Sequence, residues 1–350
     1  MKNEILLYIE QPPPMHGMTY INKIIYDSLK NEDEFHFFDT NFSLDVGEVG
    51  NKSFKKIVKN LLIMFGAWKS FFNIKPDVVY SIASASLFGI VRDFMIILPA
   101  ILFQKNLVLH LHGFTYYKIY ESSKIYKSLF DIMSKNATLV VLCEKQKEIT
   151  LNIMSKDSVV LYNCLNNENH ESIKKKNNIL TLCYISNISK EKGTFDLVKA
   201  VQKYQKKIKL IIAGNFLSDK DEFLELIKKS DNIEYIGFAD EKKKQEILQT
   251  SDIFCLPSKL EEGSPISIIE AMSYGLPIIA SDKGCIQEMI NNSGYLLESN
   301  YTINDIVDGI NLIDENYIQL SKKTKEIYIK KYSKVIFITD LKLILKENVV

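Results

Sequence analysis

The stretch Glu262-Gly-Ser-Pro-Ile-Ser-Ile-Ile-Glu270, followed at once by Ala-Met-Ser-Tyr-Gly-Leu-Pro, holds two carboxylates around a predicted helix start. Glu262 precedes the helix and Glu270 lies inside it. A helix start offers unpaired backbone N–H groups and the positive end of a dipole, which suit a phosphate group. A carboxylate two turns further along suits hydroxyl groups, so the stretch is typical of a sugar-nucleotide site. Two glutamates eight positions apart also occur on solvated helix faces, so the surrounding residues must decide between a binding site and a solvated face.

Strand-like and helix-like patterns alternate on both sides of this stretch. The apolar runs that predict strands are 5–9, 35–38, 78–82, 107–112, 139–143 and 159–162, and then 180–185, 210–213, 233–236, 253–256 and 278–280. The helical patterns are clearest at 20–30, 54–72, 87–103, 124–135 and 145–154, and only helical patterns occur from 314 to 347. Continuous apolar strands separated by helices predict parallel sheets covered by helices on both faces.

Residues 166–178 are polar and show no regular spacing of apolar residues, so this run is predicted to link two such sheets. We therefore expect an N-terminal Rossmann-like domain over 1–165, a second Rossmann-like domain over 179–330, and a C-terminal helix over 331–350 that packs back toward the first domain. Ligands of doubly wound sheets bind outside the carboxyl ends of the strands. These edges of the two domains are expected to face each other across a central cleft, with the C-terminal helices crossing both.

Composition and charge exclude several classes of protein. A formal net charge of +1 over 350 residues argues against a protein that binds nucleic acid through a basic surface. The five cysteines contain no C-x-x-C pair, which argues against a zinc site. The N-terminal run is too short and too acidic for a signal peptide, and no apolar run reaches the roughly 20 residues of a membrane span. We expect a cytoplasmic protein.

Polar and glycine residues follow several predicted strands of the second half. Gly214, Gly237-Phe238, Pro257-Ser258 and the run from Ser186-Asn187 to Lys192-Gly193 each come directly after a strand. A single glycine at such a place is a turn. Four such strand ends in one domain, beside the Glu-Gly-Ser-Pro stretch, predict a pocket for a nucleoside diphosphate.

Read in order, these motifs resemble the retaining glycosyltransferases of family 4, also called glycosyl transferases group 1. The motifs are Ser-Asn-Ile-Ser-Lys-Glu-Lys192-Gly193, Tyr-Ile-Gly237, Leu-Pro-Ser258, Glu262-Gly-Ser-Pro-(x)4-Glu270-Ala-Met-x-x-Gly275-x-Pro277 and Gly284-(x)3-Glu288. The resemblance covers 186–294 and implies the GT-B fold, which has two tandem Rossmann-like domains. The N-terminal half resembles the family only loosely, as expected for the half that selects the acceptor.

The resemblance implies donor-binding roles in the second half. Glu270 is expected to accept hydrogen bonds from the donor ribose. The backbone amides of Gly263 and Ser264 are expected to approach the sugar and diphosphate, with Pro265 in the first helical turn. Donor contacts are also expected at Asn187, Gly214, Gly237, Phe238 and Ser258.

Catalytic roles follow from the same resemblance. Glu262 is expected near the donor sugar, where it can fix hydroxyl groups and balance developing oxocarbenium charge. Lys192 is expected to neutralise the leaving diphosphate, which is a large electrostatic contribution to such a reaction. The family needs no metal for this, and no Asp-x-Asp metal signature occurs. We expect no cofactor, and a UDP-sugar in preference to a GDP-sugar as donor.

Asn187 is the main departure from the family, which usually has an arginine at this position. One of the two cationic side chains that contact the donor phosphates in the family is then missing. Lys190 or a residue of the first domain compensates, or activity is low. The substitution also leaves open a non-catalytic nucleotide-sugar-binding protein.

Two segments of the first half resemble family sites more loosely. His16-Gly17 follows the first strand, where it is either a tight turn or a loop that directs the Gly17 amide at the β-phosphate or the acceptor. His112-Gly113 ends the 107–112 strand, and in the family a His-Gly at this place faces the donor sugar across the cleft. His110 is expected to be structural.

The segment 52–72 carries five lysines, no acidic residue and the only tryptophan, Trp68. A basic helix with Trp and Phe on its apolar side is typical of peripheral contact with an anionic membrane. The alternative is a Rossmann-type core helix with a lysine-covered outer face. The contact would place the protein at the inner face of the plasma membrane.

The sequence therefore predicts a metal-independent, retaining hexosyltransferase. It would move a hexose from a nucleoside diphosphate sugar to an acceptor hydroxyl, on a saccharide or lipid-linked saccharide. Bacterial surface polysaccharide or glycolipid biosynthesis is the expected setting. The alternatives are the non-catalytic nucleotide-sugar-binding protein and a GT-B nucleotide-sugar epimerase.

Overall fold

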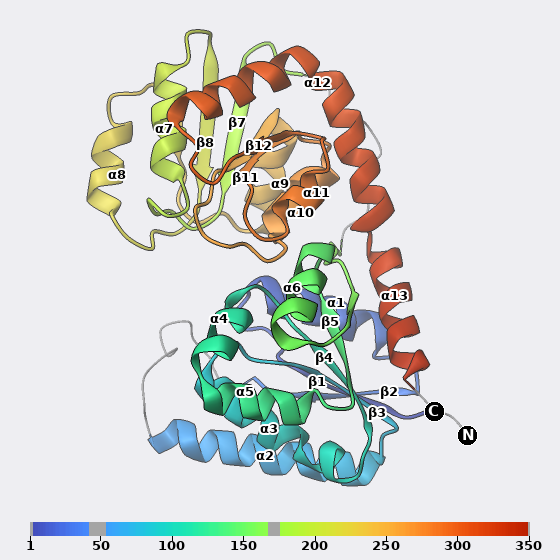
Figure 1. Cartoon of the computed structure of the whole chain (residues 1–350). Helices are drawn as coiled ribbons and strands as arrows, with labels where there is room; N and C mark the ends of the chain where they lie inside the picture. The colour runs from blue at the N-terminus through green and yellow to red at the C-terminus, as the bar shows by residue number, and fades with distance from the viewer. Residues whose placement is uncertain (1–2, 42–53, 167–175, 349–350) are drawn as a thin grey trace. The chain divides into compact units, whose positions relative to one another are not determined.

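In the computed structural model the chain divides into two units, Met1–Asn163 with Val335–Val350, and Cys164–Lys334 (Figure 1). The structure describes residues 3–41, 54–166 and 176–348, with the backbone alone for 54–57. Most of the predicted linker, 166–178, therefore lies outside the described residues.

The first unit is built on a parallel six-stranded sheet in the order β2-β1-β3-β4-β5-β6. Its strands are β1 (Ile5–Ile9), β2 (Phe35–Asp39), β3 (Val78–Ile82), β4 (Asn106–His110), β5 (Ala137–Val141) and β6 (Ser158–Val160). All five residues of β1 are buried although successive side chains point to opposite faces, because helices cover both faces. Chain order reverses across the sheet between β1 and β3, which is the topological switch point of this unit.

Most helices of the first unit pack on one face of this sheet (Figure 1). The helices are α1 (Gly17–Leu29), α2 (Phe54–Ile74), α3 (Leu87–Leu102), α4 (Thr115–Ser122), α5 (Lys124–Met133), α6 (Glu144–Met154) and α13 (Lys334–Glu347). Leu6 and Tyr8 of β1 share a core with Phe71 of α2, Ile97 of α3 and Phe130 of α5. Because the β1–β2 connection runs in the opposite direction, α1 covers the other face.

The second unit repeats the architecture with the strand order β12-β11-β10-β7-β8-β9. Its strands are β7 (Leu180–Ile185), β8 (Ile208–Ala213), β9 (Ile233–Tyr235), β10 (Ile253–Leu256), β11 (Ile278–Ser281) and β12 (Tyr295–Leu297). Its helices are α7 (Thr194–Lys203), α8 (Lys220–Ile227), α9 (Glu241–Thr250), α10 (Ile266–Ser273), α11 (Ile286–Ile290) and α12 (Ile303–Lys331). The switch point lies between β7 and β10, so the loops after these two strands flank the crevice where such sheets bind ligands.

The predicted pair of doubly wound parallel sheets is confirmed, whereas several element boundaries differ. Helix α4 and strand β12 were not predicted, and α12 begins at Ile303 rather than near 314. α12 also contains Asn316 in a non-helical conformation, which divides it into two helical segments. The central cleft between the domains stays a prediction.

Candidate functional site

The loops at the carboxyl edge of the second sheet are bonded to one another. The Ser186 amide donates to the Ala213 carbonyl at 3.1 Å, which joins the loops after β7 and β8. The Gly214 amide donates to the Gly237 carbonyl at 2.8 Å, which joins the loops after β8 and β9. These bonds hold three of the predicted strand-end residues, Ser186, Gly214 and Gly237, together at the carboxyl edge of the sheet.

Two glycines allow this close approach of backbones. A Cβ on Gly193 would lie 1.9 Å from the Pro257 carbonyl oxygen, and a Cβ on Gly214 would lie 1.8 Å from that of Ser186. No side chain fits at such distances, so both positions require glycine. The contact at Gly193 brings the loop after β7 against the loop after β10.

Lys192 and Glu262, predicted separately, form an ion pair across the switch point. The Lys192 Nζ lies 2.7 Å from the Glu262 Oε1, and the two side chains are 16% and 12% exposed. The pair is therefore largely shielded from water, where charge interactions are stronger than on an open surface. An ammonium group at this edge can meet a diphosphate, and the adjacent carboxylate can bind sugar hydroxyls.

The segment 261–265 is anchored on both sides of Glu262. The Gly284 amide donates to the Glu261 carboxylate at 2.8 Å, and the Cys285 amide donates to the Glu262 carbonyl at 3.2 Å. Ser264 is buried and Gly263 is half-buried. The expectation for Pro265 was wrong by one position: Pro265 is the N-cap of α10 in an extended conformation, and the helix begins at Ile266.

Glu270 of α10 is buried and bonded to Lys244 of α9. Burial raises the pKa of Glu270, and the Lys244 cation acts in the opposite direction. Lys244 was missed in the sequence. It lies in Glu241-Lys-Lys-Lys-Gln-Glu, where three consecutive lysines have the pattern of a solvated helix and only tertiary contact distinguishes one of them.

The remaining donor-binding candidates differ in exposure. Asn187 is exposed, and its carbonyl accepts a hydrogen bond from the Tyr184 hydroxyl. Phe238 is 72% exposed beside Gly237, and Ser258 is fully buried. Lys190, one predicted substitute for the missing arginine, is bonded instead to Glu222 of α8 at 2.6 Å.

In the first unit, His16 rather than Gly17 organises the turn after β1. His16 is the N-cap of α1, where its ring accepts from the Thr19 amide while the Thr19 hydroxyl accepts from the His16 amide. Gly17 is the first residue of α1. The backbone has the tight turn that starts a helix, and a role of the Gly17 amide toward the β-phosphate or the acceptor stays a prediction.

His110 and His112 lie one above the other at the end of β4, with ring centroids 4.1 Å apart. The His110 Nδ1 is bonded to the Tyr80 hydroxyl at 2.7 Å. Burial, assisted by the charge of His16, lowers the pKa of His112 to about 4. His112 is therefore neutral at physiological pH. Its buried Nε2 has no hydrogen-bond partner among the described residues.

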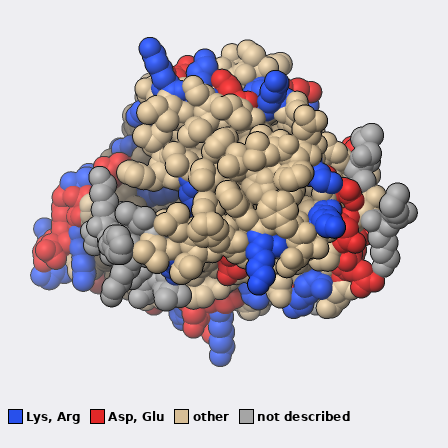
Figure 2. Space-filling view, turned by 90° about the horizontal axis from the view of Figure 1, so that it is seen from below, with Lys and Arg blue, Asp and Glu red and all other residues tan. Residues whose placement is uncertain are grey.

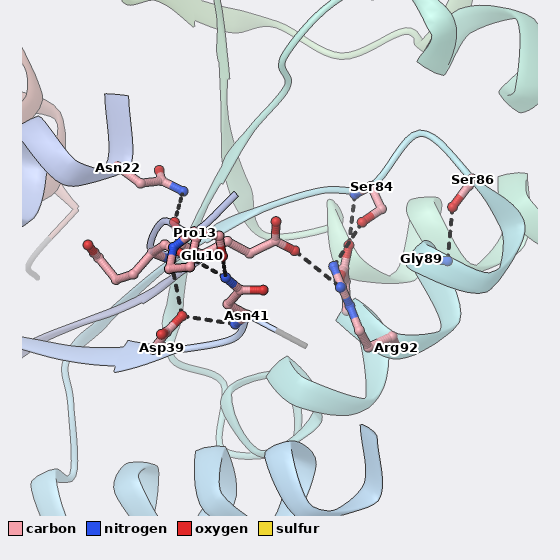
Figure 3. A network of polar contacts seen from close by, with 11 residues as sticks. Glu10, Pro13, Asn22, Asp39, Asn41, Ser84, Ser86, Gly89 and Arg92 are labelled. Carbon is pink, nitrogen blue, oxygen red and sulfur yellow. Dashed lines mark hydrogen bonds and ion pairs between the residues drawn. The ribbon is translucent and has the colours of Figure 1, made fainter. Parts of the chain in front are cut away.

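The chain's only arginine, Arg92 of α3, ties together the loops at the switch point of the first unit (Figure 3). Its guanidinium bonds Glu10 after β1 at 3.2 Å, the Ser84 hydroxyl after β3 at 3.1 Å and the buried Asp93 at 2.7 Å. The Ser84 amide in turn donates to Asp93 at 2.7 Å. This network was not predicted from the sequence.

The part of the chain that carries this second site matches a known family. Residues 166–331 match the family model described as glycosyl transferases group 1. These residues form a group 1 glycosyltransferase domain. The match covers almost the whole second unit and just under half of the chain.

Two curated relatives extend this result. A lipopolysaccharide 1,2-N-acetylglucosaminetransferase of Salmonella typhimurium is 30% identical over 168 residues, which are 43% of this chain and 44% of that protein. The chain therefore spans less than half the length of that relative. The O-antigen biosynthesis glycosyltransferase WclY of Escherichia coli is 24% identical over 69% of this chain and 72% of that protein.

Solved structures share the fold of both units. HepE from Anabaena, solved in complex with UDP-glucose, has a TM-score of 0.72 with 14% identity over 98% of this chain and 99% of that chain. The chain thus has the GT-B fold with two Rossmann-like domains, as the sequence predicted.

Proposed function

We propose that the chain is a retaining, metal-independent hexosyltransferase that uses a nucleoside diphosphate sugar, a UDP-sugar in preference to a GDP-sugar. The observation that carries the proposal is the Lys192–Glu262 pair at the switch point, with Glu270 on the helix that follows. These residues come from the matched family segment. The acceptor would be a hydroxyl of a saccharide or a lipid-linked saccharide.

The roles follow from charge. Lys192 would release Glu262 and neutralise the leaving diphosphate, because the negative charge develops there as the glycosidic bond breaks. The freed Glu262 carboxylate would hold sugar hydroxyls and stabilise oxocarbenium character. A leaving phosphate oxygen that deprotonates the acceptor on the same face would retain configuration without a covalent intermediate on Glu262. His112 and Gly17 are assigned to the donor on the resemblance alone.

The setting that we propose is bacterial surface polysaccharide or glycolipid assembly in the cytoplasm. The names of the two relatives, which concern lipopolysaccharide and O-antigen, support it.

Two variants with matched controls test the site. Glu270→Ala is expected to weaken nucleotide binding at least tenfold, and Lys192→Ala to lower kcat about a hundredfold with a smaller effect on KM. Binding is measured by thermal shift with UDP-, GDP- and ADP-sugars, and turnover by nucleotide release. As controls, Glu246→Ala and Lys209→Ala remove an exposed carboxylate and an exposed ammonium from the same unit. They should change neither nucleotide binding nor turnover. Equal behaviour of site and control variants would refute the assignment.

A second candidate function, a non-catalytic nucleotide-sugar-binding protein, is favoured by the exposed Asn187 and by the bonding of Lys190 to α8. Such a protein would show the same thermal shifts with nucleotide sugars but would release no nucleotide in the presence of any acceptor. A GT-B epimerase would instead isomerise the donor sugar without an acceptor.

A further inference from the structure

Two neighbouring helices of the first unit, α2 and α3, carry large apolar side chains on the side that faces away from the sheet. We call this the apolar face and define it by Leu62, Phe65, Phe72, Phe88, Leu102 and Phe103. Phe88 is 78%, Leu102 70% and Leu62 67% exposed. Figure 2 views the molecule from this side and shows a broad uncharged surface with both basic and acidic side chains at its border.

The apolar face is continuous from one helix to the next. Phe72 of α2 packs edge-on against Phe103 at the end of α3, with ring centroids 5.7 Å apart. Phe65 packs in the same way against Trp68, whose indole N–H donates to the Met95 carbonyl of α3 at 2.8 Å. The aromatic side chains of α2 and α3 therefore form one surface.

The core of the unit does not require these side chains. The inward side of α3 already buries Ile90, Ile96, Ile97 and Ala100 against the sheet. A helix that covers a sheet usually has a polar outer side, and one that is apolar all round is normally covered. Contiguous exposed apolar surface of this kind marks an interaction site.

The helices that form or flank the apolar face carry more lysine than acidic side chains. Residues 58–76 contain Lys59, Lys69 and Lys75 and no Asp or Glu, and α5 adds Lys124 and Lys127, with Lys135 just beyond its end. The acidic residues of α3 and α5 are engaged: Asp93 is buried against Arg92, and Asp131 accepts from the Tyr120 hydroxyl at 2.9 Å. Such a surface is complementary to an anionic partner.

We propose that the apolar face docks on a lipid bilayer that contains anionic lipids. The leucine and phenylalanine side chains enter the boundary between headgroups and acyl chains, and the lysines contact the lipid phosphates. A second copy of the chain fits less well, because it would bring two lysine-bearing faces together while the carboxylates of α3 and α5 are already bonded within each copy. Among the helices that the structure describes, none is long and apolar enough to cross a membrane, so the contact is peripheral. The proposal rests on the first unit alone and does not depend on the reaction proposed above.

The first experiment uses the full chain and vesicles. Phosphatidylcholine vesicles with about 30% phosphatidylglycerol should bind the protein in flotation assays at least tenfold more tightly than phosphatidylcholine alone, and binding should weaken as salt is raised. Trp68, the only tryptophan, reports the contact directly. Its emission should shift to shorter wavelength and be quenched by brominated acyl chains.

The second experiment tests whether vesicle binding depends on the apolar face itself or on any exposed apolar side chain of the first unit. Leu62→Glu combined with Phe88→Glu should reduce vesicle binding at least tenfold. Leu151→Glu combined with Leu343→Glu alters comparably exposed leucines on α6 and α13 of the same unit and should leave binding unchanged. Both double variants should keep the thermal midpoint of the parent, since all four side chains are exposed.

Three outcomes overturn the proposal. The first is no binding of the unaltered chain to anionic vesicles. The second is equal loss in the two double variants. The third is a concentration-dependent dimer that Leu62→Glu with Phe88→Glu abolishes, with no vesicle binding, which would make the apolar face a self-association surface. Loss of glycosyl transfer with vesicle binding intact would leave the docking proposal standing and refute only the proposed reaction.

Discussion

The Lys244–Glu270 pair shows how one residue controls the charge of the site. Glu270 is buried on α10, and a buried carboxylate without a cation tends to take up a proton. A protonated Glu270 has lost half its capacity to accept hydrogen bonds from a ribose. Lys244 of α9 lowers the pKa of Glu270 against the effect of burial and so favours the ionised form, which makes Lys244 a positioning residue for nucleotide binding rather than a direct ligand.

Lys244→Met should therefore destabilise the fold in a pH-dependent way. Without Lys244, the pKa of Glu270, already raised by burial above its ordinary value of 4.5, rises further. An acid whose folded pKa exceeds its unfolded pKa stabilises the fold only while protonated, so the deficit is small near pH 4.5 and grows as the pH rises through the folded pKa. We expect about 3 kcal/mol at pH 8, measured by urea unfolding across the pH range.

Two further variants make this result specific. Combining Lys244→Met with Glu270→Gln removes both charges and should recover most of the loss. Lys243→Met removes the neighbouring exposed lysine and should cost no more than about 0.5 kcal/mol. A Lys244→Met deficit independent of pH would show that Lys244 acts through packing and not through charge.

At the scale of elements, the contact between the loops after β7 and β10 depends on Gly193. Gly193 has a φ of +73° and Gly237 one of +76°, so alanine is strained by its backbone to a similar degree at both. Their surroundings differ, because a Cβ at Gly193 would overlap the Pro257 carbonyl and a Cβ at Gly237 would meet nothing within 4 Å.

Gly237→Ala should accordingly cost about 1 kcal/mol of unfolding free energy, and Gly193→Ala at least about 2 kcal/mol more. The extra cost arises because one loop must move away from the other, and Lys192 moves with it. Urea unfolding of the two variants measures the difference. Equal costs would mean that the loops separate easily and that the contact does not hold Lys192 in place.

Helices and strands with one clear pattern of apolar residues could be predicted from the sequence. The apolar run at β10 predicts its strand almost residue for residue, since a buried parallel strand has little else in it. Strand β12 has only three residues, and α4 only two turns rich in tyrosine, so neither has a period long enough to detect. The start of α10 was placed one residue early because proline suits both an N-cap and a first turn.

The candidate site was predictable only where it lies within one sequence motif. Lys192, Glu262 and Glu270 belong to motifs, and the structure brings the first two together. Lys244 and Arg92 contact residues 26 and 82 positions away, and no local pattern encodes such distances. The apolar face was predicted only in part: the sequence indicated a basic helix with an apolar side over 52–72, whereas the contribution of α3 depends on how the two helices pack.

At the scale of the whole molecule, the two units carry separate internal reporters. Trp68 lies in the first unit, whereas Cys183 on β7 and Cys255 on β10 are buried in the second. Burial raises the pKa of the Cys255 thiol, so it reacts slowly until its strand is exposed.

Donor nucleotide at about a hundred times its Kd should slow labelling of Cys183 and Cys255 by up to about a hundredfold, because it binds only the folded second unit. Peptide-resolved mass spectrometry after timed exposure to a thiol reagent measures each site. Labelling rates that nucleotide leaves unchanged would place the nucleotide site outside the second unit. At the same nucleotide concentration, Glu270→Ala should reduce the protection at least about tenfold.

The single arginine has a practical consequence for chemical footprinting. Dicarbonyl reagents modify guanidinium groups and leave lysine ammonium groups largely untouched, so a chain with many lysines has one addressable position, Arg92. Its guanidinium is held between β1, β3 and α3 with a side chain only 15% exposed. The adduct yield at Arg92 therefore measures how often the loops at the switch point of the first sheet open. It can be read from one peptide by mass spectrometry, in a crude extract and without any engineered label.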